Sequence, residues 1–211
     1  MNRTAHKTFI LRYYLLIAAL LMWGIIPISL SADNGDVPFD LQAKLILTAL
    51  TYDKNLQEKP DKHLKIGVLY FPPTPQSQEE GMEFLKTLNG FKDKKISGLN
   101  FDTAIFTYTD ISMLKKDITD NTIDLLYLAR GDTKTITDVI GLTRSEKILS
   151  CTSRAEYVTT CGVTMAVGLK DNKPKIYLNR SSAQLEGAEF SAKFLRIAEL
   201  VGENTTLNPN R

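Results

Sequence analysis

The spacing of apolar residues alternates between strand-like and helix-like along most of the chain. The stretch His63–Phe71 holds a short apolar run with β-branched members, which is typical of a strand buried on both faces of a parallel sheet. Pro72, Pro73 and Pro75 end this strand, because proline lacks a backbone N–H and disfavours helix in the preceding residue. We expect it to be the first strand of the sheet and place it at the centre.

Helical spacing of apolar residues precedes and follows this strand. It predicts a first helix from Leu41 to about Asp53, and a second helix that Ser77 caps and Asn89-Gly90 ends. The same reasoning predicts three later helices, which begin at Asp110 or Ser112, at Asp132 or Thr133, and at Phe190, the last reaching Val201.

Further strand-like runs lie between these helices. They cover residues 101–108, 123–129, 148–151, 162–169 and 175–178. The last two runs are joined by a short connection with Asp171-Asn172, which predicts an antiparallel hairpin. Strands that alternate with helices indicate an α/β fold, a three-layer sandwich with a mostly parallel sheet. We expect one such domain over residues 41–202, followed by a polar tail over residues 203–211.

The first 32 residues have the pattern of a secretory signal peptide. A basic leader precedes an apolar, uncharged stretch over residues 13–30, and the small residues that follow suit a signal peptidase. The alternative is an uncleaved anchor, because residues 13–30 are almost long enough to cross a bilayer. Gly24 and Pro27 favour cleavage. Residues 33–40 are expected to form a flexible lead-in, and export places the mature chain in the periplasm.

Removal of the leader changes the charge of the chain. The full sequence has 26 Lys and Arg against 24 Asp and Glu, and the leader holds three of the basic residues and no acidic one. The mature chain therefore carries 23 basic and 24 acidic residues, a net charge of about −1. This balance excludes the cationic surface that nucleic-acid binding requires.

Few residues remain that could support catalysis. The mature chain has only Cys151, Cys161 and His63 as cysteine or histidine, too few for a zinc site of the usual composition. A Ser-His-Asp triad would have to use His63, which we interpret as a surface residue beside lysines. Phosphate-loop, nucleophile-elbow and metalloprotease motifs are absent from the sequence. We therefore expect no enzymatic activity, no metal and no cofactor.

The two cysteines are most simply interpreted as a disulfide, because the chain is predicted to be exported. A Cys151–Cys161 bond would close a short loop and contribute about 3 kcal/mol in the chain-entropy model. In the structural interpretation, this disulfide fixes a strand–loop–strand connection. The alternative is a redox-sensitive loop.

Ligands of open parallel sheets bind outside the carboxyl ends of the strands. Those ends hold Tyr70, Tyr108, Arg130 and Asp132, which we predict as ligand-binding residues. Arg130 is the candidate for an anion, because its guanidinium matches a carboxylate or phosphate. The alternative is a surface arginine that pairs with Asp132 or lies in solvent.

Three regions are candidates for a partner surface. Phe71 with Pro72 and Pro73 would form a rigid docking loop, and the alternative is an ordinary strand-to-helix connection. The exposed parts of the first helix, which ends near Tyr52, and of the final helix are the others.

Two stretches resemble the YfiR/HmsC family of periplasmic regulators. The segment KIYLNRSSAQLEGAEFSAKFLRIAELV, residues 175–201, is similar to the family's C-terminal strand, break and helix, with Asn179, Ser191 and Arg196 at matching positions. The opening LQAKLILTALTYDKNL before KIGVLY is similar to its first helix and strand. The resemblance covers nearly the whole mature chain.

The resemblance implies a function. Studied members are not enzymes; they bind the periplasmic part of an inner-membrane diguanylate cyclase and inhibit it, which lowers cyclic di-GMP and restrains biofilm formation. The family also implies a disulfide at Cys151–Cys161. This chain lacks a second, N-terminal cysteine pair found in some members, and its first helix ends in residues 51–55 instead of an aromatic ending.

The sequence thus leaves rival functions. The first is a periplasmic inhibitor of a membrane sensor, most simply a diguanylate cyclase, that binds one state of the sensor better than the other. The alternative is a small-molecule binding protein that uses the strand-end cleft. A hydrolase would need an acid–base or nucleophile cluster that the sequence does not offer. A second copy of the chain is a further candidate partner.

Overall fold

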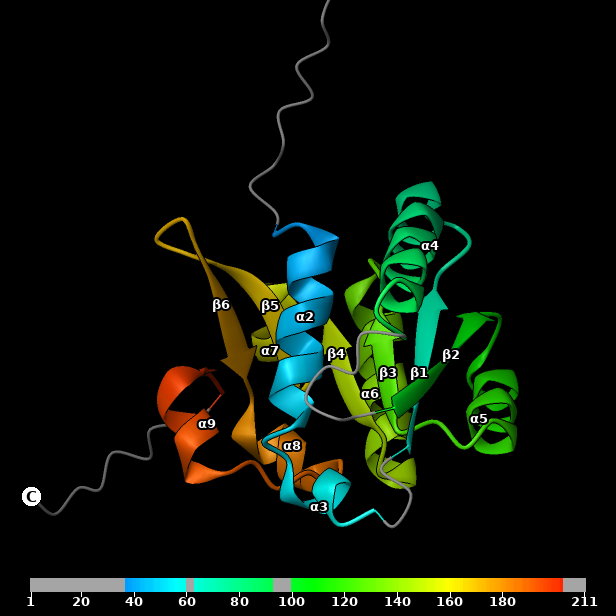
Figure 1. The fold of residues 1–211 in the computed structure, drawn as a ribbon. Coiled ribbons are helices and arrows are strands. Elements are labelled where there is room, and N and C mark those ends of the chain that lie inside the picture. The colour runs from blue at the N-terminus through cyan, green and yellow to red at the C-terminus, as the bar shows by residue number, and fades with distance from the viewer. Residues whose placement is uncertain (1–36, 60–62, 93–99, 203–211) are drawn as a thin grey trace, which may run out of the picture. The chain divides into compact units, whose positions relative to one another are not determined.

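The computed structural model describes residues 37–59, 63–92 and 100–202, in which helices and strands alternate (Figure 1). The helices are α2 (Phe39–Leu50), α3 (Lys54–Gln57), α4 (Pro75–Asn89), α5 (Ile111–Asp120), α6 (Thr133–Glu146), α7 (Ala155–Thr160), α8 (Arg180–Leu185) and α9 (Ala192–Ile197). The strands are β1 (His63–Tyr70), β2 (Asn100–Thr107), β3 (Leu125–Leu128), β4 (Leu149–Thr152), β5 (Met165–Lys170), β6 (Lys173–Leu178) and β7 (Glu199–Leu200). The predicted signal peptide and polar tail lie outside the described residues.

The described strands form one sheet of seven strands in the order β2-β1-β3-β4-β5-β6-β7. All neighbours pair in parallel except β5 and β6, which form an antiparallel hairpin. Asp171 and Asn172 both have positive φ in its turn, as a two-residue hairpin connection requires. The predicted fold class and hairpin are therefore confirmed. The central position expected for β1 is wrong, because β1 lies next to the edge strand β2.

Two apolar clusters, one on each face of the sheet, make this a three-layer structure. Leu64, Ile66 and Val68 of β1 pack into the cluster that α2 and α4 cover, which includes Phe84. Leu69, the next residue along β1, belongs to the other cluster, which α5, α6 and α7 cover. Alternate strand residues point to opposite faces, and because both faces of β3 are buried, β3 is apolar at every position.

Some helix ends differ from the expected positions. α2 begins at Phe39, inside the expected flexible lead-in, directly after Pro38. α4 begins at Pro75 instead of Ser77, because proline suits the first helical position. The final helix does not reach Val201: α9 ends at Ile197, and the next residues form β7 beside β6.

The expected disulfide is absent, and this part of the prediction is wrong. Cys151 and Cys161 are free and buried. Cys151 of β4 packs in the cluster beneath α2 and α4, whereas Cys161, at the end of α7, packs in the cluster on the other face. The expected strand–loop–strand connection contains the helix α7. The sheet therefore lies between the two thiols.

A buried carboxylate connects the C-terminal part of the chain to the sheet. Glu186 follows α8 and is nearly inaccessible to solvent. Its oxygens accept hydrogen bonds from the Thr143 hydroxyl (2.6 Å), the Thr164 hydroxyl (2.6 Å), and both the N–H (2.8 Å) and the hydroxyl of Ser150. Burial raises the pKa of Glu186, while these hydrogen bonds oppose the rise. One side chain thus joins α6, β4, the start of β5 and α8.

Candidate functional site

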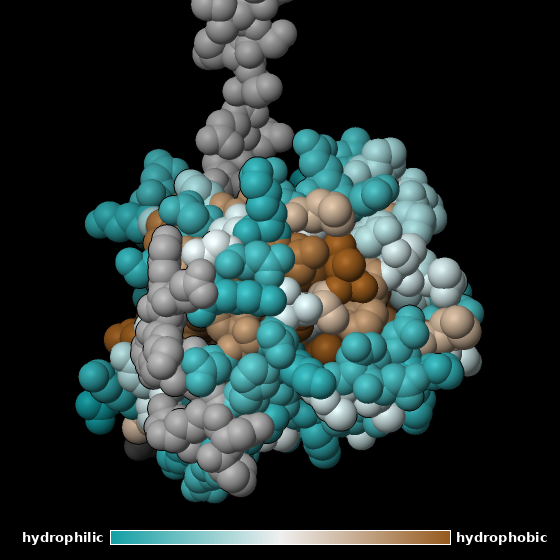
Figure 2. All heavy atoms as spheres, turned by 45° about the vertical axis from the view of Figure 1, so that its right-hand side comes forward, coloured by the Kyte–Doolittle hydropathy of each residue, from teal (hydrophilic) through white to brown (hydrophobic). Residues whose placement is uncertain are grey.

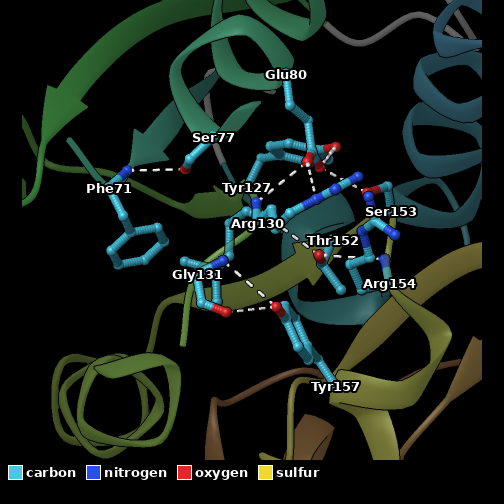
Figure 3. A network of polar contacts seen from close by, with 11 residues as sticks. Phe71, Ser77, Glu80, Tyr127, Arg130, Gly131, Thr152, Ser153, Arg154 and Tyr157 are labelled. Atoms are coloured by element: carbon cyan, nitrogen blue, oxygen red, sulfur yellow. Dashed lines mark hydrogen bonds and ion pairs between the residues drawn. The ribbon is translucent and has the colours of Figure 1, made fainter. Parts of the chain in front are cut away.

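The strand order places a topological switch point at the carboxyl ends of β1 and β3. The chain leaves β1 towards α4 on one face of the sheet and leaves β3 towards α6 on the other face. In a doubly wound sheet this divergence opens a space between the two loops, where ligands bind. Figure 3 shows the polar side chains that gather at this edge.

Glu80 of α4 lies at the centre of this network, with only 8% of its surface exposed. Its Oε1 accepts hydrogen bonds from the Tyr127 hydroxyl (3.0 Å) and the Ser153 hydroxyl (2.6 Å). Its Oε2 accepts a hydrogen bond from the backbone N–H of Arg130 (3.2 Å). Burial raises the pKa of Tyr127 well above its usual value, which keeps this hydroxyl protonated as a donor. The carboxylate therefore ties α4 to the ends of β3 and β4.

Arg130 follows β3 and places its guanidinium beside Glu80. Its Nε lies 3.9 Å from Glu80 Oε2, and its side chain is 44% exposed. That Nε has no hydrogen-bond partner among the described residues. The alternative pairing with Asp132 is not present among the described residues: Asp132 caps α6 by accepting a hydrogen bond from the Thr135 N–H (2.9 Å). Hydrogen bonds from the Thr135 side chain, and then from its backbone, lower the pKa of Asp132.

Tyr157 fixes the loop that carries Arg130. The Tyr157 hydroxyl donates to the carbonyl of Gly131 (2.6 Å) and accepts from its N–H (3.3 Å). A side chain at position 131 would come within 2.8 Å of the Phe71 ring, so this close approach requires glycine. The loop after β3 is thus held on one side by α7 and on the other by the end of β1.

Tyr70 and Tyr108 lie at the ends of β1 and β2, beside the network but without a contact to Glu80 in the described structure. Tyr70 accepts a hydrogen bond from the Thr107 hydroxyl (2.6 Å), and its carbonyl accepts from the Tyr108 N–H. Partial burial, and then the nearby Asp138, raise the pKa of Tyr108. The four predicted ligand residues therefore all lie at the carboxyl ends of the strands. Of the four, only Arg130 belongs to the Glu80 network.

The expected partner surface needs a correction. Phe71 is buried, with 4% of its surface exposed, and packs against Tyr108 at a ring distance of 5.4 Å. Pro72 and Pro73 are exposed, as expected. Tyr52, at the end of α2, stacks on Phe194 of α9 at a ring distance of 5.5 Å. These residues do not form one surface. Tyr52 follows α2, which ends on the side where β1 begins, whereas Phe71 follows the end of β1 (Figure 1).

Several site residues were not predicted from the sequence. Ser153 and Arg154 directly follow β4, so the rule that selected Arg130 would have found them. The Arg154 N–H donates to the Thr152 hydroxyl (3.3 Å) at the same edge (Figure 3). A different pattern could have identified Glu80: it is a charged residue on the buried face of a helix, one turn before Phe84.

Comparisons with known proteins show the fold alone. No protein-family model and no curated protein sequence matches the chain. The ABC domain from Streptococcus pneumonia, solved in complex with L-Trp, is 17% identical with a TM-score of 0.51. A conserved domain protein from Vibrio cholerae is 16% identical with a TM-score of 0.52. In both cases the match covers 77% of this chain and 60% of the other, so the chain spans less than two thirds of these structures.

A third structure has a lower TM-score of 0.48 and 15% identity. It is the ligand-free, open form of a substrate binding protein with adhesive properties from Clostridium difficile. The match covers 72% of this chain and 58% of the other.

Across the described ranges, no helix has the length and apolar character needed to cross a membrane.

Proposed function

We propose that the chain binds a small molecule that carries a carboxylate, such as an amino acid, at the carboxyl ends of β1, β3 and β4. The observation that supports this most directly is the position of Arg130 after β3: its side chain is 44% exposed, while its buried Nε lies 3.9 Å from Glu80 Oε2. An arginine fork binds a carboxylate through two parallel hydrogen bonds. The neighbour solved with L-Trp is consistent with this ligand class.

Glu80 has a supporting role in this proposal. A buried carboxylate beside Arg130 holds the backbone of that residue and opposes its charge, so the guanidinium keeps one position before a ligand arrives. Ser153 and Tyr127 saturate the other Glu80 oxygen. The ligand carboxylate would therefore contact Arg130, and its remaining groups would lie along the ends of β3 and β4.

Thermal unfolding with a panel of amino acids and simple carboxylates tests this function. We expect at least one compound to raise Tm, because a ligand at 100 times its Kd stabilises the folded state by about 2.7 kcal/mol. Arg130→Gln should lower the affinity about tenfold or more, since a hydrogen bond to a charged group contributes about 1.5–3 kcal/mol. Isothermal titration calorimetry measures that change.

Two further variants make the result specific. Arg130→Lys keeps the charge but removes the fork, so it should retain only part of the affinity. Arg196→Gln removes an exposed arginine of α9 and should bind as the unaltered chain does. If no compound in the panel raises Tm, or if Arg130→Gln binds as tightly as Arg196→Gln, the proposal is wrong.

A second candidate function is the regulatory one that the resemblance implies. In it, the exported chain binds the periplasmic part of an inner-membrane sensor, such as a diguanylate cyclase. One observation favours a protein partner: apolar side chains gather on one face of the domain (Figure 2). On the surfaces of α4 and β2, Met82 is 51% exposed and Ile105 37% exposed, and a hydrogen bond from Thr103 to Asn89 (2.8 Å) holds these two elements together. Exposed apolar patches are typical of interaction sites.

Crosslinking in intact cells followed by mass spectrometry separates this candidate from the first. We expect capture of a membrane protein with a cyclase domain, and loss of that capture in Met82→Lys and Ile105→Lys. Met113→Lys is the matched control, because Met113 is equally exposed but lies on α5, against the other face of the sheet. Capture of the chain by itself alone, or equal loss in the control, would count against a sensor partner. The absence of enzymatic activity stays a prediction in both cases.

A further inference from the structure

A cavity lies where β1 and β3 begin, at the end of these strands opposite to Arg130. Its volume is about 320 Å³. The lining comes from the end of α3, from β1, and from the turns before β3 and β4, and includes Lys59, Lys65, Thr122, Asp124, Glu146 and Lys147. This size is within the range of small-molecule sites.

Both acidic side chains of the lining are already neutralised. Asp124 pairs with Lys59 through one oxygen, and its other oxygen accepts the N–H of Lys65 (2.9 Å). Glu146 pairs with Lys115 of α5 (2.9 Å), and this contact lowers the pKa of Glu146. Neither carboxylate is therefore available to offset the remaining lysines.

Two ammonium groups keep hydrogen-bonding capacity at this cavity. Lys147 donates one hydrogen bond to the carbonyl of Leu185 (2.8 Å), and an ammonium group has three donors. The ammonium group of Lys65 forms no ion pair or hydrogen bond with another residue in the described part of the chain. The cavity thus has an excess of positive charge with free donors.

The backbone around the cavity is also unusual. Thr122 and Lys147 both have positive φ, at 53° and 59°. The other non-glycine residues with positive φ in the described structure, Asp171 and Asn172, form the hairpin turn. Lys147 is the left-handed cap of α6, and Thr122 directly follows the cap of α5, so the closing turns of two helices meet at this cavity.

We propose that this cavity binds an anion that carries a phosphate group, with Lys65 and Lys147 as its ligands. Lysine binds phosphate as a point charge and needs no planar fork. The site is separate from the strand-end crevice and does not depend on the function proposed above, because the two lie at opposite ends of β1 and β3.

Thermal unfolding and calorimetry of the purified chain with inorganic phosphate and with glycerol 3-phosphate test the site, against sodium chloride at equal ionic strength. We expect a rise in Tm above that in chloride. Lys65→Gln and Lys147→Asn should each lower the affinity about tenfold, since each removes a hydrogen bond to a charged group. Asparagine tolerates the positive φ of position 147, so that variant should fold.

Lys86→Gln removes an exposed lysine of α4 and is the control. Stabilisation by inorganic phosphate alone would identify free phosphate as the ligand, and tighter binding of glycerol 3-phosphate would identify a phosphate monoester. Equal effects of phosphate and chloride would overturn the proposal. So would a loss of affinity in Lys86→Gln as large as that in Lys65→Gln, because the binding would then be general charge attraction.

Discussion

Replacement of Glu186 by alanine is expected to lower the free energy of unfolding by about 3–5 kcal/mol. The side chain accepts hydrogen bonds from Thr143, Ser150 and Thr164, all of which are buried. Its removal leaves these donors without an acceptor in an apolar surrounding, and it also leaves a cavity between α6 and α8. Urea denaturation with matched m-values measures the loss.

Glu186→Gln provides the control and a pH test. The amide keeps the shape but cannot accept hydrogen bonds at both ends, so a smaller loss is expected. Burial raises the pKa of Glu186 in the folded chain, so the folded state holds this proton at pH values where the unfolded chain has released it. The stability that this group contributes therefore falls as pH rises from about 4.5 through the raised pKa. The advantage of the unaltered chain over Glu186→Gln should shrink over that range; an advantage that grows would contradict the assignment.

Replacement of Phe84 by alanine is expected to cost a similar amount, about 3–5 kcal/mol. Phe84 is fully buried between α4 and the sheet, and its ring stacks on Tyr127 at a centroid distance of 3.6 Å. The variant loses the buried area of one ring and leaves the Tyr127 ring without its neighbour. Chemical denaturation gives the change in stability.

The same change should weaken ligand binding at the strand ends. Tyr127 donates to Glu80, which in turn holds the backbone of Arg130. Phe84→Leu is the matched variant, because it keeps most of the apolar volume and should lose less stability and less affinity. A loss below about 1 kcal/mol in Phe84→Ala would show that the core closes around the missing ring.

The strands were predictable because of how parallel sheets are buried. A strand covered on both faces needs apolar residues at nearly every position, and β1 and β3 have them. The hairpin was predictable from Asp171-Asn172, because the two residues accept the positive φ that its turn requires. The helices α3 and α7 were missed, because each is too short to show a helical period.

The site was predictable only in part, for a different reason. Arg130 follows a buried strand. The strand ends of such a sheet can be predicted as the ligand side without knowledge of any side-chain contact. Glu80 is 50 residues away along the chain, and no local pattern indicates which strand its helix covers. The disulfide prediction failed because the spacing of Cys151 and Cys161 gives no information on which face of the sheet each one occupies.

The placement of the Glu80 network has a consequence for how the protein can change over evolution. Arg130, Ser153 and Tyr108 lie on separate loops, which follow β3, β4 and β2. A substitution in one loop alters one side of the crevice and leaves the apolar strands beneath it intact. Ligand preference can therefore diverge between descendants of one ancestor while the sheet persists, long after the sequences have ceased to be recognisably related.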